Sequence, residues 1–188
     1  SHRSRLVSMH PHSLNVLFVL LYSATIVAAD DPLFEDATKQ SGIQFRHVSP
    51  LTPERHLHLV MGSGIGWLDF DRDGWPDLYL AQGAPFGKAD REQFAARGES
   101  SDRLLRNLGQ GQFDDVSDRS GLVDLDYSMG ITVGDFDNDG FRDIYVSNYG
   151  VNRFHRNNGD GTFDELAASL NLDDAGFGSS CTWADLDA

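Results

Sequence analysis

Cysteine and basic residues are both scarce in this sequence. Cys181 is the single cysteine, so no intrachain disulfide can form and the fold is not a disulfide scaffold. There are 15 Lys and Arg against 29 Asp and Glu, which gives a net charge of −14. This balance argues against nucleic acid or anionic membrane as a partner.

Long apolar runs are also missing, except for residues 14–28 near the N-terminus. This stretch is too short and too interrupted for a typical membrane span. Arg3 and Arg5 precede it, and the small residues of Val27-Ala28-Ala29 suit cleavage before Asp30. We therefore expect a signal peptide at 1–29, a chain that is secreted or located at the cell surface or in the periplasm, and no membrane span after cleavage. A signal anchor is the alternative.

Acidic residues, in contrast, are concentrated in two copies of one nine-residue loop, Asp69–Asp77 and Asp135–Asp143. Each loop places carboxylates at positions 1, 3, 5 and 9 and a glycine, Gly74 or Gly140, at position 6. Calcium binds six to eight oxygen ligands, and a tight loop supplies them with this alternation and a glycine turn. The predicted Ca²⁺ ligands are Asp69, Asp71, Asp73, the Trp75 carbonyl and Asp77; Asp135, Asp137, Asp139, the Phe141 carbonyl and Asp143; and, in a third partial copy, Asp185 and Asp187.

An EF-hand begins with similar spacing, but it ends with a glutamate at position 12 and lies between helices. Position 12 is Leu80 or Val146 here, and the flanking residues are aromatic, aliphatic and glycine, which is typical of strands. Each loop is therefore predicted to join two strands. An acidic turn without an ion is the alternative interpretation.

A repeat extends beyond these loops. The first two loops start 66 residues apart, at positions 69 and 135, and the third copy starts 50 residues later, at position 185. A second element recurs at the shorter spacing, since residues 102–116 match residues 152–166 in an apolar run, a glycine turn and a second short run. That pattern predicts a β-hairpin.

One unit therefore reads as four strands in about 50 residues, the pattern of a β-propeller blade. We expect an all-β chain that encodes a little over two blades of an incomplete propeller, with a core between neighbouring blades. Cys181 aligns with Ile131 and is predicted to be a small buried residue. The predicted segments are a signal peptide at 1–29, an N-terminal segment with a blade-closing outer strand at 30–60, a first repeat with an insertion at 61–127, a second repeat at 128–175, and the start of a third at 176–188.

The strings 61–80, 106–116 and 135–140 resemble FG-GAP (VCBS-type) repeats, in particular those of secreted proteins similar to cartilage acidic protein. The resemblance spans roughly residues 33–188. It implies an extracellular propeller with calcium bound on each repeat. The ASPIC/UnbV-type segment that often follows in such proteins is not present in this sequence.

No catalytic fingerprint is found: there is no Gly-x-Ser-x-Gly elbow, phosphate loop or dinucleotide motif. His56 and His58 could ligate a transition metal, although a polar strand face explains them better. We expect a non-enzymatic extracellular interaction or adhesion module whose partners are an unidentified protein or glycan and the remaining blades. The alternative is a non-catalytic propeller segment of a larger secreted enzyme that acts on polysaccharide. The first repeat's insertion, near 85–97, is either a contact surface or a tolerated loop.

Overall fold

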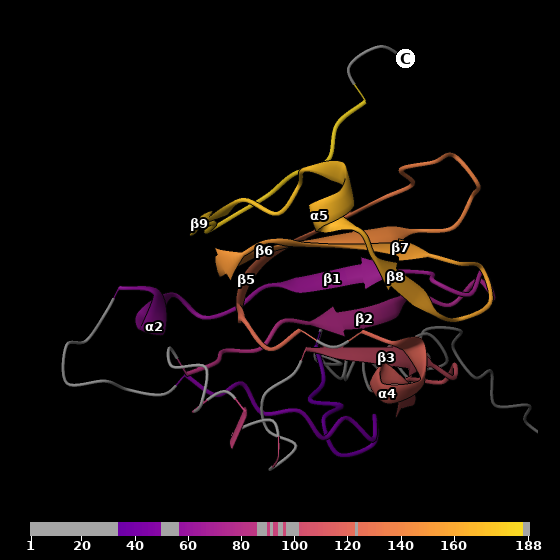
Figure 1. The fold of residues 1–188 in the computed structure, drawn as a ribbon. Helices are drawn as coiled ribbons and strands as arrows, with labels where there is room; N and C mark the ends of the chain where they lie inside the picture. The colour runs from indigo at the N-terminus through magenta and orange to yellow at the C-terminus, as the bar shows by residue number, and fades with distance from the viewer. Residues whose placement is uncertain are drawn as a thin grey trace, which may run out of the picture. The chain divides into compact units, whose positions relative to one another are not determined.

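The computed structural model describes residues 34–49, 57–85, 90, 92–93, 96, 102–122 and 124–185. The chain divides into a unit that spans residues 1–36 and a unit that spans residues 37–188, and all the elements named below lie in the second unit (Figure 1). The predicted signal peptide and most of the predicted insertion lie outside the described residues. Within the described ranges, no helix is long and apolar enough to cross a lipid bilayer.

Two antiparallel sheets make up the second unit, as predicted for an all-β chain. In the first sheet the strands follow chain order, β1 (Ile65–Leu68), β2 (Asp77–Leu80), β3 (Arg103–Asn107) and β4 (Phe113–Asp115). In the second the order is β5 (Tyr127–Gly134), β6 (Asp143–Val151), β7 (Arg153–Asn157) and β8 (Phe163–Glu165), and β9 (Ala175–Phe177) pairs with the end of β6.

The two sheets repeat the same local structure. Each acidic loop joins the first and second strands of its sheet, and the pairs that close the loops are equivalent, Leu68 with Asp77 and Gly134 with Asp143. A single helical turn follows each fourth strand, α4 (Ser117–Ser120) and α5 (Ala167–Leu170), and α2 (His58–Met61) precedes β1. The strand order predicted for one repeat is therefore confirmed in both sheets.

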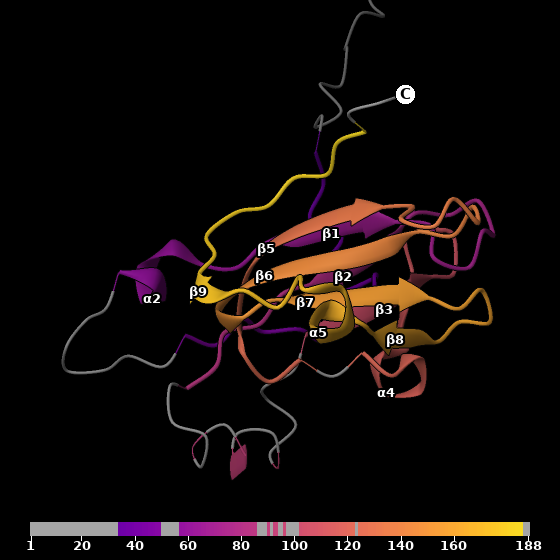
Figure 2. The same ribbon diagram turned by 45° about the horizontal axis from the view of Figure 1, so that its top comes forward.

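The main apolar core lies between the sheets. The two sheets are stacked, with β1 beside β5 in both views (Figures 1 and 2). Side chains from both sheets share one cluster, with Tyr79 and Leu104 from the first sheet and Ile144 and Val146 from the second all fully buried. Because a sheet buries apolar side chains only against a second layer, each repeat depends on its neighbour for a core. The predicted core between neighbouring repeats is thus observed.

Glycines on the inner strands permit this close stacking. The Gly64 amide donates a 2.7 Å hydrogen bond to the Met129 carbonyl oxygen across the two sheets. A Cβ added at Gly66 would lie 2.8 Å from the Ile131 Cγ2 atom, and one added at Gly64 would lie 2.8 Å from the Met129 oxygen. Both distances are too short for a real Cβ contact. The absence of side chains at these two positions therefore sets how closely β1 approaches β5.

The start of the third repeat lies against β5 in the same manner. A Cβ at Gly130 would lie 2.8 Å from the Ser180 Cα, and one at Gly134 would lie 2.5 Å from the Trp183 ring. Residues 178–185 form no strand, whereas in the two preceding repeats the strand before the loop pairs with the strand after it. Cys181 is half-buried, and burial raises the pKa of its thiol. The thiol is thus protonated at neutral pH, as a packing role requires.

The segment before β1 covers the other face of the first sheet. Its residues 37–49 form no strand. The Phe113 amide of β4 donates to the Ser41 carbonyl oxygen at 2.9 Å. Ile43 and Phe45 pack against a small cluster on that sheet, which consists of Leu78, Leu80 and Leu105. The predicted blade-closing strand within 30–60 stays a prediction.

A buried polar network at the far end of each sheet distinguishes the two repeats. The Tyr79 hydroxyl donates to Asp102 Oδ2 at 2.8 Å, and the Gln82 amide donates to Asp102 Oδ1 at 2.7 Å. In the second repeat Asn152 has the equivalent place, with its amide on the Tyr145 hydroxyl at 3.0 Å. Burial, reinforced by the nearby Asp124 carboxylate, raises the pKa of Asp102 well above its ordinary value. The first repeat therefore buries a carboxyl group where the second repeat has a neutral amide, and ionisation of that carboxyl is unfavourable.

We predict that Asp102→Asn stabilises the protein at neutral pH and raises the melting temperature by roughly 2–6 °C. Because the pKa of the Asp102 carboxyl is higher in the folded state than in the unfolded state, the protein becomes less stable as pH rises from the unfolded pKa to the folded pKa, and asparagine removes this loss. Thermal melts between pH 4 and 8 test this. The reciprocal control, Asn152→Asp, should destabilise at neutral pH. A lower melting temperature for Asp102→Asn at neutral pH would contradict this account.

Candidate metal centre

Both acidic loops lie at the same end of the two sheets (Figure 2), and the Arg72 guanidinium of the first loop lies 5.2 Å from the centroid of the Phe141 ring of the second. In the first loop, carboxylate oxygens of Asp69, Asp71 and Asp77 lie within 4.8 Å of one another. In the second loop, carboxylate oxygens of the equivalent residues do the same; they are Asp135, Asp137 and Asp143. The structure therefore brings together positions 1, 3 and 9 of each predicted site.

Backbone amides shape each loop around its first aspartate. The amides of Asp73 and Gly74 both donate to the Asp69 carboxylate at 3.1 Å. Arg72, at position 4, and Gly74, at position 6, both have positive φ angles of 58° and 87°. A residue in this left-handed region is strained unless it is glycine or asparagine, and the second loop has Asn138 at position 4.

The second loop repeats this geometry closely. The amides of Asp139 and Gly140 donate to the Asp135 carboxylate at 3.1 and 3.0 Å. Asn138 and Gly140 have φ angles of 58° and 90°. Two loops that differ in several side chains adopt one backbone conformation, so the aspartate and glycine spacing determines it.

The last aspartate of each loop is buried. The Asp77 carboxylate is 0 % exposed and accepts hydrogen bonds from the amides of Phe70 at 3.0 Å and Asn107 at 2.8 Å. Burial raises the pKa of Asp77 to about 6; the two amides oppose this, and the carboxylates of Asp71 and Asp73 add to it. Without a cation, this carboxylate is therefore mostly ionised at neutral pH and becomes protonated as the pH falls below about 6.

Asp143 has the same environment in the second loop. Its carboxylate is 1 % exposed and accepts from the amides of Phe136 at 2.7 Å and Asn157 at 2.9 Å. Burial raises the pKa of Asp143 as well. Both loops thus combine two partly or fully exposed carboxylates with one buried carboxylate.

The remaining predicted ligands stand outside these trios. At position 5, Asp73 accepts from the Trp75 amide at 2.9 Å and Asp139 accepts from the Phe141 amide at 2.8 Å. Trp75 and Phe141 each pack over a hairpin glycine, since added Cβ atoms at Gly109 and Gly159 would meet their rings. Asp185 is described but joins no trio, and Asp187 lies outside the described residues.

The donor set fits a hard cation. Each trio offers only carboxylate oxygens, without nitrogen or sulfur, which suits Ca²⁺ better than a transition metal. In the part of the chain that the structure describes, these two aspartate trios are the groups of His, Cys, Asp or Glu that could hold an ion. His56 lies outside that part.

Comparison with known families agrees with this geometry. The sequence profile of the FG-GAP-like repeat matches residues 69–146 and 135–188, and each match begins at the first aspartate of a loop. Together the matches cover more than half of the chain. The chain belongs to the FG-GAP-like repeat family. A search of curated proteins gave no significant match.

In both FG-GAP-like repeats an asparagine of the neighbouring hairpin holds the acidic loop in place. Asn107 and Asn157, at the ends of β3 and β7, donate their backbone amides to Asp77 and Asp143. Their side-chain amides donate to carbonyl oxygens at position 8, with Asn107 on Pro76 at 2.8 Å. In the sequence these asparagines stand only beside the glycine turn of the predicted hairpin. Their recurrence directly after Arg106 and Arg156 was the available signal.

Asn157 also connects the two repeats. Its side-chain amide donates to the Phe70 carbonyl oxygen of the first loop at 2.8 Å. The Arg72 guanidinium lies 5.2 Å from the centroid of the Phe141 ring, a second contact between the loops. The two candidate sites are therefore joined directly by protein contacts.

Burial lowers the pKa of two histidines, His155 and His47. His155 on β7 is 2 % exposed, and burial lowers its pKa to about 4. It is therefore neutral at physiological pH. His47 Nε2 lies 2.8 Å from the Ser63 hydroxyl, and burial lowers its pKa as well.

We predict that Asn157→Ala destabilises the protein more than the matched change Asn107→Ala, by about 1 kcal/mol. Both variants lose the side-chain hydrogen bonds within their own repeat and keep the backbone ones, but only Asn157→Ala loses the bond to Phe70 in the other repeat. Urea unfolding of the two variants measures the difference. Equal losses would show that the contact between repeats contributes nothing.

We also predict that calcium affinity falls below pH 6. Asp77 must be ionised to bind a cation, and its pKa in the metal-free loop is about 6. The apparent affinity of the first loop should decrease by up to about tenfold per pH unit, with proton release on binding. Calorimetric titration in two buffers of different ionisation enthalpy measures the released proton. An affinity that does not change between pH 7 and 5 would contradict the assignment of Asp77 as a ligand.

Proposed function

We propose that this chain is a calcium-binding segment of an extracellular β-propeller that acts as an interaction or adhesion module. The observation that carries the proposal is that two loops with the same backbone geometry each gather three carboxylates, one of them buried. A cation among these oxygens would remove their mutual repulsion, so its binding free energy would add to the free energy of folding.

The position of the loops supports a role in rigidity. Both loops touch the boundary between the two repeats, through Asn157 on Phe70 and Arg72 on Phe141. Ions in the loops would therefore stabilise the packing of one repeat on the next as well as each loop. A module with a fixed arrangement of repeats can present a preorganised surface to a partner.

The propeller itself is inferred from how the repeats stack. Gly64, Gly130 and Ser180 are equivalent positions in three successive repeats. Gly64 lies beside Gly130, and Gly130 lies beside Ser180, so each repeat contacts the next in the same way. On the outer side of β1, Ile65 and Trp67 are 62 % and 59 % exposed. We infer that a further blade packs on this face, and the remaining blades of the protein are the first partners proposed.

Secretion and the external partner complete the proposal. The apolar stretch 14–28 and the small residues before Asp30 favour export, and the resemblance to secreted proteins similar to cartilage acidic protein agrees with this. The acidic surface favours an extracellular protein or glycan partner over nucleic acid. We propose no catalytic role, because the carboxylates recur in each repeat and would be occupied by ions.

We predict that calcium raises the melting temperature and that Asp137→Asn removes about half of this increase. Asp137 belongs to the second trio and is exposed, so its replacement weakens the site with little direct effect on folding. Scanning calorimetry with and without calcium measures the increase. Asp164→Asn is the matched control, because this carboxylate is exposed and lies outside both trios. An unchanged calcium effect in Asp137→Asn would refute the proposed site.

A further inference from the structure

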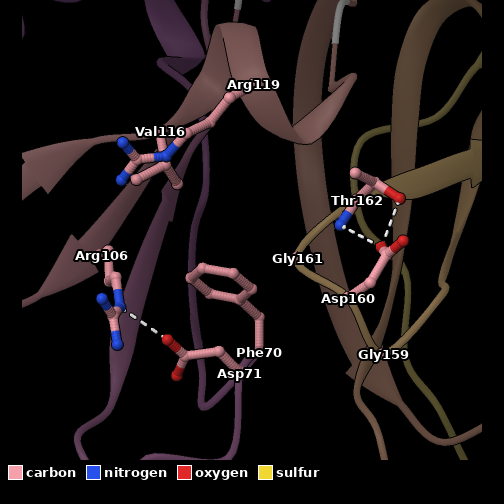
Figure 3. A pocket seen from close by; sticks show the side chains of 9 residues that line it. All are labelled: Phe70, Asp71, Arg106, Val116, Arg119, Gly159, Asp160, Gly161 and Thr162. Atoms are coloured by element: carbon pink, nitrogen blue, oxygen red, sulfur yellow. Dashed lines mark hydrogen bonds and ion pairs between the residues drawn. The ribbon is translucent and has the colours of Figure 1, made fainter.

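Arg106 places a positive charge inside the first metal loop. From the end of β3, its Nε atom lies 2.6 Å from Asp71 Oδ2 and its Nη2 atom lies 3.0 Å from Asp73 Oδ2. Figure 3 shows the guanidinium turned toward the Asp71 carboxylate. Asp71 is also a member of the carboxylate trio, so the arginine and a metal ion would share one ligand.

In the second loop the equivalent arginine lies farther from the carboxylates. Arg156 stands at the matching position on β7, but its guanidinium lies 4.0 Å from Asp137 and 3.7 Å from Asp164. Its Nη2 atom donates instead to Asn158 Oδ1 at 3.0 Å. The first repeat has Leu108 in place of Asn158, and the leucine side chain cannot accept a hydrogen bond from Arg106. The two loops share one backbone geometry but differ in how closely the arginine of the third strand contacts their carboxylates.

We propose that Arg106 is an internal competitor for calcium that makes the first loop the weaker of the two sites. This inference rests on the proposed calcium binding. The guanidinium partly neutralises Asp71 and Asp73 in the metal-free loop, and a divalent ion would have to break or loosen both contacts. The second loop would bind calcium with a smaller cost of this kind. The protein would then fill its two sites at different calcium concentrations.

The surroundings of Arg106 allow it to leave. Its side chain is 38 % exposed and lines a cavity of about 580 Å³ between the first loop and the β7–β8 hairpin (Figure 3). Phe70 and Arg119 line the same cavity, and Asp160 and Thr162 lie on its opposite wall. Arg119 is paired with Asp114 at 2.8 Å and does not occupy the loop. A released Arg106 side chain therefore has space in this cavity.

The competition is measured with one loop at a time in the full chain. Asp137→Asn weakens the second loop and leaves the first to be titrated, and Asp69→Asn does the reverse. Calcium titration calorimetry then compares each background with and without the arginine change. We expect Arg106→Gln to tighten calcium binding to the first loop by about three- to tenfold, the range for two partly exposed ion pairs. The matched change Arg156→Gln should tighten the second loop by less than half as much.

Stability gives a second readout. Without calcium, Arg106→Gln should melt at a lower temperature than the parent chain, because Asp71 and Asp73 lose their ion pairs with the guanidinium. With saturating calcium its melting temperature should rise by more than that of the parent. Arg106→Lys is a second variant for the case in which Arg106→Gln does not fold. It keeps the charge without the two-point contact, so its calcium affinity should lie above that of the parent chain and below that expected for Arg106→Gln.

The outcomes separate this inference from the proposal beneath it. If Arg106→Gln leaves calcium binding to the first loop unchanged, or weakens it, Arg106 is not a competitor. The assignment of the two calcium sites would not be affected by that result. Absence of calcium binding to either loop in folded protein would overturn both.

Discussion

The clustering of three carboxylates in each acidic loop is the constraint on which the rest of this structure depends. Their oxygens lie within 4.8 Å of one another, and the third carboxylate, Asp77 or Asp143, is buried. Such an arrangement is costly without positive charge, because burial and like charge both oppose ionisation. The hydrogen bonds from Phe70 and Asn107, and from their equivalents in the second repeat, hold the buried carboxylate in place despite this cost.

The same hydrogen bonds link the loops to the fold. Each buried aspartate begins the second strand of its sheet and is held by an asparagine at the end of the third strand. Asn157 then reaches the first loop across the boundary between repeats. Hydrogen bonds therefore connect the loop conformation, the strand pairing and the stacking of the repeats. We expect a change in charge at a loop to alter the packing between the sheets.

Much of this could be predicted from the spacing of residues. Alternating aspartates and Gly74 or Gly140 predicted the loop conformation, and the recurrence of loop and hairpin predicted two similar four-stranded sheets. Asn157 and Arg106 were not found, because their roles arise when a third strand is placed beside a loop about 15 to 35 residues earlier in the chain. No local pattern encodes that proximity. The burial of Asp102 was also missed, since its partners Tyr79 and Gln82 are 23 and 20 residues away in the chain.

A nuclear magnetic resonance titration with calcium tests the central claim most directly. The amides of Gly74 and Gly140 donate to the first aspartate of each loop, so their resonances report ion binding at each site separately. The account predicts that both resonances shift and saturate after two calcium equivalents, while the hairpin glycines Gly111 and Gly161 change much less. A well-dispersed spectrum of folded protein in which neither Gly74 nor Gly140 responds to calcium would contradict it.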